Sequence, residues 1–413
     1  MKFHELVSST KEYNMIKTDL MIVIPSYMKI EVLKRHLDFL QAQTYKTFNV
    51  IAVLGPDYDD KTLDSHIWSK KYDFGIIVVK RKDDTGSAGG FFTGQKYVLE
   101  NEYPYHILAD DDCFPTESNV VETLYSNRGH KYVAAKKRYI SLDHKEKIDP
   151  NNCVAQYTLF SLDILKQHGL YFAPLYIGGD DGEYQQRVGG KPYYVDIGVE
   201  HIGSGFDFFK VFDKTWAYAV NGFVAMKRPK DIIYSFFRSY VGPLAIMITF
   251  FPHYGKKAAA DFLTLTTEHK FGKEAHRRLK SGFQNYIFDE SKINNISAYK
   301  KIEFRNEIFT YPIARKIKFL FSIITENFRK EMVITDCYND LPVQLLSVVA
   351  GSAYIKIDEN RWLLVCDNRN PVIHIGKIII LPIIISFLAA YFVLVLIPIK
   401  ILNQPKTEKY GLD

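Results

Sequence analysis

The sequence predicts an α/β fold in which a mostly parallel sheet is covered by helices on both faces. Short apolar runs at 20–24, 48–54 and 75–79 each end in a polar or Gly/Pro-rich stretch. Between the first two runs, Leu33, Leu37 and Leu40 recur at helical spacing. Buried strands that alternate with amphipathic helices are typical of parallel sheets with covered faces.

Composition narrows the functional classes. The chain has 413 residues, which is enough for two or three domains, each with its own core. Its net charge of +6 comes from small scattered basic clusters, and no nucleic-acid-binding module is recognisable. Aromatic residues make up 15%, which favours ring-lined surfaces for sugars or a membrane interface. The four cysteines are far apart, so we expect a reducing compartment and no disulfide scaffold.

Three consecutive acids follow another apolar run. Asp110, Asp111 and Asp112 come directly after Ile107-Leu108-Ala109, and Pro115 closes the stretch. In open α/β sheets, ligands bind outside the carboxyl ends of the strands. Adjacent carboxylates repel one another unless a cation is present, and oxygen ligands favour Mg²⁺ or Mn²⁺. Because extended side chains alternate, Asp110 and Asp112 should point one way and Asp111 the other.

A glycine-rich stretch follows the third apolar run. Gly86-Ser87-Ala88-Gly89-Gly90 is predicted to be a loop before a helix that starts near Phe91. Glycines let backbone N–H groups approach a ligand closely, and a helix N-terminus favours phosphate. The alternative is a plain tight turn.

Further along the chain, strands are expected at 132–135, 154–160 and 193–199, with a helix over 162–168. Asp180 and Asp181 follow Gly178-Gly179, where they could start a helix or supply a general base. His201 comes after the last of these strands.

These motifs, in this order, resemble a family 2 glycosyltransferase of the GT-A fold. The matching stretches are Ile22–Tyr27, Gly86–Phe91, Asp110–Asp112, Asp180–Tyr184 with Arg187, and His201. A weaker match, Tyr234–Ser239, is similar to an element of the galactofuranosyl- and rhamnosyltransferase-like branch. The resemblance covers roughly residues 20 to 245.

The resemblance implies roles for individual residues. Asp181 is implied to be the catalytic base, beside Asp180. The metal ligands, for Mn²⁺ or Mg²⁺, are implied to be Asp112, Asp110 and His201. The residues implied to contact the nucleotide sugar are Pro25, Ser26, Tyr27, Asp57, Asp84, Gly86, Ser87, Ala88, Gly89, Gly90, Asp110 and Asp111.

The C-terminal part carries a membrane signal. Residues 378–399 hold no charge over 22 positions (399 − 378 + 1), which is about 33 Å of helix and enough to cross a bilayer. We therefore expect a catalytic domain at 1–225, a mainly helical and partly interfacial region at 226–372, and a transmembrane or re-entrant segment at 373–402. A polar tail at 403–413 follows.

The expected function is a membrane-anchored, metal-dependent, inverting glycosyltransferase. It would move a sugar from a nucleotide-diphosphate sugar to a lipid-linked or polysaccharide acceptor. Because nucleotide sugars are cytosolic, the catalytic domain should face the cytoplasm at the cell membrane. Two alternatives are a polyprenyl-phosphate glycosyl synthase and a non-catalytic sugar-nucleotide-binding scaffold. No nucleic-acid partner is expected, and a homo-oligomer stays open.

Overall fold

The structure of the chain is a computed structural model. It describes residues 2–27, 30–58, 60–135, 138–140, 146–148, 156–201, 220–225, 254–279, 287–289, 300–303, 332–336, 353–356, 361–364 and 371–412. The predicted Tyr234–Ser239 element lies outside these residues.

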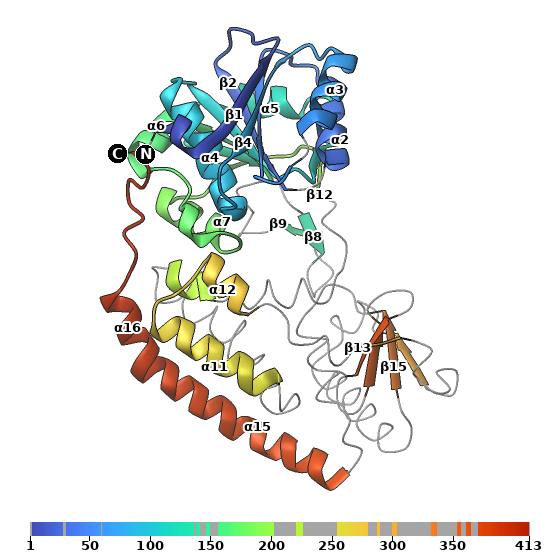
Figure 1. Cartoon of the computed structure of the whole chain (residues 1–413), viewed down its shortest axis with the longest axis vertical. Helices are drawn as coiled ribbons and strands as arrows, with labels where there is room; N and C mark the ends of the chain where they lie inside the picture. The colour runs from blue at the N-terminus through green and yellow to red at the C-terminus, as the bar shows by residue number, and fades with distance from the viewer. Residues whose placement is uncertain are drawn as a thin grey trace.

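An eight-stranded mixed sheet forms the centre of the predicted catalytic domain, in the order β1-β4-β3-β2-β5-β10-β7-β11 (Figure 1). Its strands are β1 (Val7–Tyr13), β2 (Leu20–Ser26), β3 (Asn49–Leu54), β4 (Gly75–Arg81), β5 (Tyr105–Ala109), β7 (Tyr132–Ala135), β10 (Gln156–Ser161) and β11 (Tyr193–Val195). Strands β4, β3, β2 and β5 pair in parallel, whereas β1 and β10 are antiparallel to their neighbours. The predicted fold class is confirmed.

Helices cover both faces of this sheet. They are α1 (Phe3–Leu6), α2 (Ile30–Gln41), α3 (Asp60–Lys70), α4 (Gly86–Glu100), α5 (Val120–Ser126), α6 (Leu162–His168) and α7 (Asp180–Val188). Alternate residues of β2 face opposite cores: Ile22 packs in the cluster with Leu37 of α2, and Val23 packs in the cluster with Phe91 of α4. This alternation makes the sheet the middle layer of three.

Helix α4 begins at Gly86, five residues before the predicted start near Phe91. A Cβ atom on Gly90 would lie 2.6 Å from Pro25 Cβ, and one on Gly94 would lie 2.2 Å from Val23 Cγ1. The glycines therefore let α4 pack directly against β2. The expected glycine loop is corrected to the first turns of a helix.

Two further expectations change at the ends of the domain. The N-terminal residues, for which the sequence predicted no element, form α1 and the edge strand β1, in which only Val7 and Tyr13 are buried. The strand predicted over 193–199 stops at Val195. A separate strand, β12 (Val199–His201), pairs with β6 (Cys113–Pro115) in a second, two-stranded sheet.

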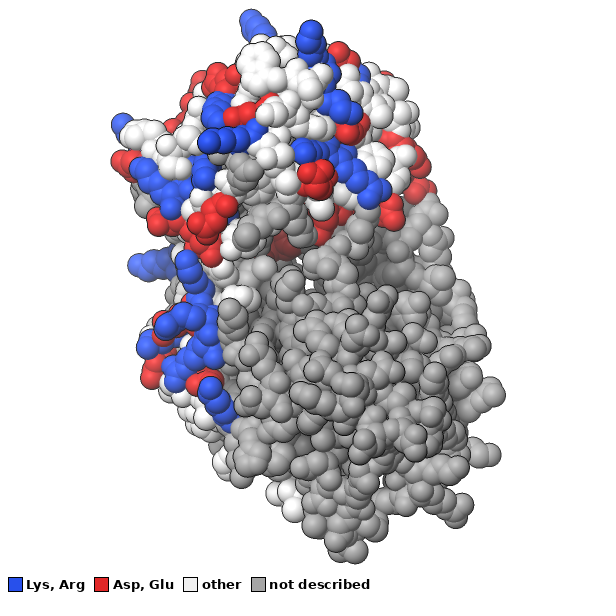
Figure 2. Space-filling model, turned by 45° about the vertical axis from the view of Figure 1, so that its right-hand side comes forward, with Lys and Arg blue, Asp and Glu red and all other residues white. Residues whose placement is uncertain are grey.

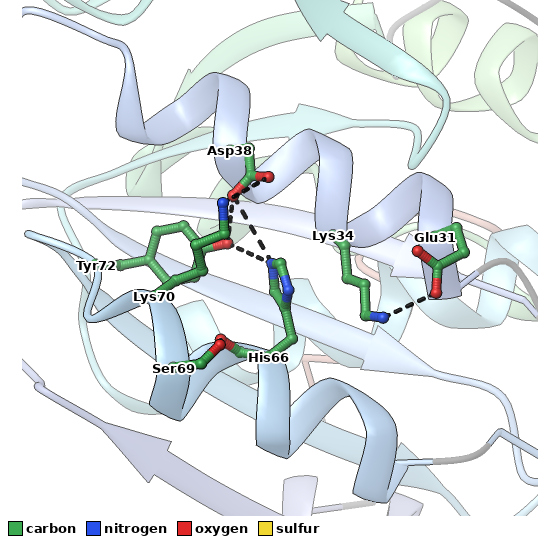
Figure 3. A network of polar contacts seen from close by, with 7 residues as sticks. All are labelled: Glu31, Lys34, Asp38, His66, Ser69, Lys70 and Tyr72. Carbon is green, nitrogen blue, oxygen red and sulfur yellow. Dashed lines mark hydrogen bonds and ion pairs between the residues drawn. The ribbon is translucent and has the colours of Figure 1, made fainter.

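Acidic and basic side chains are interspersed over the catalytic domain (Figure 2). Between α2 and α3 they form a network of polar contacts (Figure 3). The Tyr72 hydroxyl donates to Asp38 Oδ1 at 2.8 Å and lies 2.8 Å from His66 Nε2, and Lys70 pairs with Asp38 at 3.5 Å. Burial lowers the pKa of His66. This network fastens the two helices together on the face of the sheet that holds α2.

The region at 226–372, predicted to be mainly helical, contains both helix and sheet in its described residues. The helices are α11 (Tyr254–Thr267) and α12 (Lys273–Arg278). A five-stranded sheet, which the sequence did not predict, consists of β13 (Ile287–Asp289), β17 (Arg361–Leu364), β16 (Ala353–Lys356), β15 (Met332–Asp336) and β14 (Lys300–Glu303).

A long apolar helix ends the chain. It runs through α15 (Pro371–Tyr391), the π-helical turn η7 (Phe392–Leu396) and α16 (Ile397–Leu402). Among the described residues, the segment Pro382–Leu402 is the one stretch long and apolar enough to cross a membrane, and 17% of its most apolar window is buried. The helix runs alongside α11, and the tail after it returns to the catalytic domain (Figure 1).

Candidate active site

The acidic triplet lies at the carboxyl end of β5, at the centre of the sheet. Asp110 is half-buried, and Asp111 and Asp112 are each 8% exposed. The Ser26 hydroxyl at the end of β2 donates to Asp111 Oδ2 at 2.7 Å. His36 Nδ1 of α2 lies 3.2 Å from the Asp111 carbonyl oxygen. Asp111 is thus held by β2 and α2.

His36 is a supporting residue that the sequence reading did not single out. Its Nε2 lies 2.6 Å from the Tyr157 hydroxyl of β10, and burial lowers the His36 pKa to about 4. Tyr157 has a positive φ of 58°, at a register irregularity of β10. A histidine on the apolar face of α2, beside Leu33 and Leu37, was the available signal. The neutral imidazole ties the triplet backbone to the core.

Asp180 and Asp181 start α7. Gly178 and Gly179 both have a φ of +80°, a conformation that favours glycine, and so direct the chain into the helix. The Tyr171 hydroxyl donates to Asp181 Oδ1 at 2.7 Å, and the Ser87 hydroxyl donates to Asp180 Oδ2 at 3.3 Å. Asp181 is half-buried and Asp180 is buried. Because Ser87 belongs to α4, the glycine-rich segment and the acidic pair meet here.

The two groups of acids share one electrostatic environment. Burial, followed by the negative charges of Asp181 and Asp112, raises the pKa of Asp110 well above its ordinary value. Burial and the charge of Asp181 raise the pKa of Asp180 to about 7. A bound cation would relieve the repulsion between these like charges. Carboxylate oxygens, which gather at the end of β5, are the ligand type that a hard divalent ion prefers.

The backbone of His201 also lies beside the acidic triplet. In the β12–β6 pair, His201 lies opposite Cys113, the residue after Asp112. The sheet thus brings the two chain segments of the predicted metal site together. The His201 side chain lies outside what the structure describes, and no group of three or more His, Cys, Asp or Glu side chains within the described ranges is arranged to hold a metal.

Asp84 and the start of α4 form another side of the site. The Tyr176 hydroxyl donates to Asp84 Oδ2 at 2.8 Å, and Lys273 Nζ of α12 donates to the Asp84 carbonyl oxygen at 2.9 Å. Arg81 Nη1 donates to Thr85 Oγ1 at 2.7 Å. These contacts hold the first turn of α4 in place.

Other predicted nucleotide contacts differ in accessibility. Ala88, Gly89 and Gly90 are buried within α4, while Gly86 and Ser87 are half-buried, and the contact of all five with the nucleotide stays a prediction. Pro25 packs against Gly90. Tyr27 and Asp57, at the ends of β2 and β3, are exposed. Their roles in binding stay predictions.

Arg187, part of the matched acidic motif, has a structural position. Its Nε and Nη2 atoms each lie 2.8 Å from a carboxylate oxygen of Glu183. Its Nη1 and Nη2 also donate to the carbonyl oxygens of His168 and Leu170. This pair is buried and fixes α7 against the end of α6.

Asn221, which the sequence reading missed, clamps the turn before the acidic pair. It is fully buried, and its Nδ2 donates to the carbonyl oxygens of Leu175, Ile177 and Gly178 at 2.8, 2.8 and 3.0 Å. Its Oδ1 accepts the backbone N–H of Gly272 at 2.8 Å. Nothing in its local sequence marks this role, because the partners are distant in the chain.

Replacing Asn221 by Ala is expected to destabilise the fold by about 3 kcal/mol, because it leaves buried backbone groups without partners. Urea unfolding would measure the change. Asn127→Ala, which removes a single side-chain bond to Thr123 O at the C-terminal end of α5, is the control and should cost less than about 1 kcal/mol. Equal losses of unfolding free energy in the two variants would contradict the role assigned to Asn221.

The raised pKa of Asp180 predicts a pH-dependent stability. Since its pKa is raised from 3.8 to about 7, the folded state keeps a proton that the unfolded chain loses, and stability falls as pH rises through this window. Asp180→Asn should remove this loss. Its gain in unfolding free energy should be larger at pH 8 than at pH 5, by about 2 kcal/mol without metal. Denaturant titrations at both pH values, beside the exposed Asp163→Asn, test this; a gain that does not change with pH contradicts it.

Part of the chain, which includes the acidic triplet, is similar to a known protein family. Residues 21–167 match the family model described as glycosyl transferase family 2. This stretch is a glycosyltransferase family 2 domain. It contains the ends of β2 to β5, the start of α4 and the whole acidic triplet. The protein is a glycosyltransferase with the GT-A fold. The search of curated proteins found no match.

Several solved structures are similar to the chain, at low identity. A mannosyltransferase from Pyrobaculum calidifontis, in complex with GDP-Man and Mn²⁺, has 13% identity and a TM-score of 0.40, covering 65% of this chain and 81% of that one. TarS 1–349 from S. aureus has 10% identity and a TM-score of 0.40, covering 60% and 80%. Glucosyl-3-phosphoglycerate synthase from Mycobacterium tuberculosis has 13% identity and a TM-score of 0.37, covering 49% and 78%. At these values the likenesses carry no functional argument.

Proposed function

We propose that this protein is an inverting, metal-dependent glycosyltransferase. It moves a sugar from a nucleotide-diphosphate sugar to a hydroxyl group of a lipid-linked or cell-surface glycan. The observation that carries the proposal is the meeting of Asp110–Asp112 with Asp180 and Asp181 at the carboxyl end of β5, inside and beside the family 2 domain. Ligands bind at that edge of an open α/β sheet.

The donor would lie across the ends of β2, β3 and β5. Tyr27 and Asp57 are exposed there and would contact the base, while Asp110 would lie near the ribose. Gly86 and Ser87 at the start of α4 would face the diphosphate, because a helix N-terminus favours negative charge. Asp111 positions this edge through its bond with Ser26.

Asp112, Asp110 and His201 would hold a divalent cation, Mn²⁺ or Mg²⁺. When bound, that ion supplies positive charge that stabilises the leaving diphosphate. The crowded carboxylates at the end of β5 are suited to such an ion, since burial and mutual repulsion disfavour their charged forms without one.

Asp181 would take the proton of the acceptor hydroxyl as that oxygen attacks the anomeric carbon. The Tyr171 hydroxyl donates to Asp181 Oδ1 and so fixes the orientation of this carboxylate. A single base on the side opposite the leaving diphosphate gives inversion at the sugar. Asp180, buried and bonded to Ser87, would position the turn.

The proposal is tested by incubating the purified full-length protein with individual nucleotide sugars and measuring release of nucleoside diphosphate. Release should need a divalent metal and should rise when a glycan acceptor is added. Asp181→Asn protein, prepared in the same way, is the control for contaminating activity. If no nucleotide sugar is turned over with any metal while binding persists, the protein is a sugar-nucleotide-binding scaffold instead.

We also propose that the protein is attached to the cell membrane through residues 373–402, with the catalytic domain on the cytoplasmic side. The support is the apolar segment Pro382–Leu402, whose most apolar window has a mean hydropathy of 2.6. Such attachment would place the site beside a lipid-linked acceptor.

A further inference from the structure

The tail after the apolar helix is anchored on the catalytic domain. The Leu170 N–H donates to the Tyr410 carbonyl oxygen at 2.8 Å, and Lys96 Nζ donates to the Gly411 carbonyl oxygen at 3.0 Å. The Tyr410 ring packs against Phe92 and Phe172, with ring centroids 5.4 and 4.9 Å apart. The residues that follow α16 therefore lie on the same side of any membrane as the catalytic domain.

Helices α11 and α12 lie on that side as well. The Gly272 N–H donates to Asn221 Oδ1 at 2.8 Å, and Lys273 donates to the Asp84 carbonyl oxygen. Asn221 and Asp84 both border the active site. The chain thus leaves α12 and returns in the tail on one side, so residues between Leu279 and Asn403 must cross a membrane an even number of times or not at all.

A second crossing segment is missing from the sequence between these points. Between Leu279 and Lys377 the longest run without Asp, Glu, Lys or Arg is Leu341–Ile355, which has 15 residues (355 − 341 + 1). As a helix it would span about 22 Å, short of the roughly 30 Å hydrocarbon core. Its last residues also belong to β16, which pairs with β15 and β17. One candidate span cannot give an even number of crossings.

The apolar helix has one face on the protein. Leu388, Phe392, Leu396 and Lys400 recur every four residues and are all buried. The Phe392 ring lies 5.5 Å from that of Phe223. Lys400 Nζ donates to the carbonyl oxygens of Phe223 and Val224, at the end of the helical residues 220–225. These contacts hold the helix along the side of the molecule.

On the opposite face, the exposed large side chains that the structure describes between Ile379 and Leu402 are apolar. They are Ile379, Ile380, Ile383, Phe387, Val393, Leu394, Ile401 and Leu402, with exposed fractions between 49% and 83%. Ser386, an exposed polar residue within this stretch, donates its hydroxyl to the Pro382 carbonyl oxygen of its own helix. Ser386 therefore needs neither water nor a separate protein partner, which suits hydrocarbon.

We propose that α15, η7 and α16 lie in the plane of the membrane as a monotopic anchor and do not cross it. The exposed apolar face enters one leaflet, and the protein covers the other face. Nearby, α11, α12 and the turn between them expose Lys257, Lys270, Lys273, Arg277 and Arg278. Three acids lie among them: Lys270 pairs with Glu268 and Glu274, and Arg278 pairs with Asp261, which leaves an excess of positive charge. Basic side chains gather at one edge of the molecule below the catalytic domain (Figure 2). This charge complements a leaflet that contains anionic lipids.

The inference rests on the proposed membrane attachment, so attachment is measured first. Full-length protein is floated with phosphatidylcholine vesicles, with and without phosphatidylglycerol. The variant Phe387→Glu/Leu394→Glu should reduce the vesicle-bound fraction by about tenfold or more. Trp68→Glu, which charges an exposed aromatic of α3, should leave it unchanged. If wild-type protein stays unbound, or pairs with a second copy through this face, the anchor is wrong.

Orientation is measured separately. Cys153, Cys337 and Cys366 are replaced by Ser, Cys113 is buried, and single cysteines are placed at Ser126, Asn370 and Gln404. Sealed vesicles carrying the protein are treated with a membrane-impermeant maleimide. All three cysteines should react from the side of the catalytic domain. Labelling of Asn370→Cys only after the vesicles are opened would show that the helix crosses, while leaving the attachment and the transferase activity intact.

Discussion

Asp181→Asn is expected to lower sugar transfer by about 10²-fold or more while donor and metal binding are retained. The substitution removes the proposed proton acceptor but keeps the size of the side chain. Since the charge of Asp181 raises the pKa of Asp110, its removal should also make the Asp110 carboxylate easier to ionise. Initial rates, beside donor affinity by calorimetry in the presence of Mn²⁺, separate catalysis from binding.

Two matched variants test whether the loss of transfer is specific to Asp181. Asp180→Asn should slow transfer less, because Asp180 is buried and bonded to Ser87. Tyr171→Phe removes only the hydroxyl that holds Asp181, so its loss should fall between those of the two acids. If Asp180→Asn is the slower enzyme, the two roles are exchanged. If neither acid matters while transfer continues, the acceptor needs no base, as expected for a polyprenyl phosphate.

Asp112→Asn is expected to weaken metal and nucleoside-diphosphate binding together, by about 10²-fold, with the fold intact. The buried carboxylate at the end of β5 is the strongest ligand candidate, and the metal would link it to the diphosphate. Titration of Mn²⁺ followed by electron paramagnetic resonance measures metal binding in the absence of turnover. Calorimetry with the nucleoside diphosphate, with and without Mn²⁺, measures the coupling.

His201→Ala should show the same joint loss, because the β12–β6 pairing places its backbone beside the triplet. Asp111→Asn is the control in the same triplet: its carboxylate already accepts the Ser26 hydroxyl, so metal affinity should change less. Full activity in excess EDTA, with an unimpaired Asp112→Asn enzyme, would remove the metal from the proposed mechanism.

The local sequence determined the architecture around the site. Apolar runs such as 20–24 and 75–79 are buried strands, and Leu33, Leu37 and Leu40 face the core as their spacing predicted. The sequence predicts where these strands end. A strand buried on both faces needs apolar side chains throughout, so the change to polar residues marks the edge of the sheet. The position of the acidic triplet at that edge followed from the chain alone.

Tertiary structure decided what surrounds the triplet. Asn221, His36 and Tyr157 support the site through partners 43 to 121 residues away, and no local pattern records such contacts. The early start of α4 depends on the close approach of Gly90 to Pro25 of β2. The apolar helix is long enough to cross a bilayer. Because Tyr410 after it packs against Phe92 and Phe172 of the catalytic domain, we expect the helix to lie in the plane of the membrane instead. Composition specifies how much apolar surface a segment has, whereas only the folded chain determines which face of it is covered and on which side its ends lie.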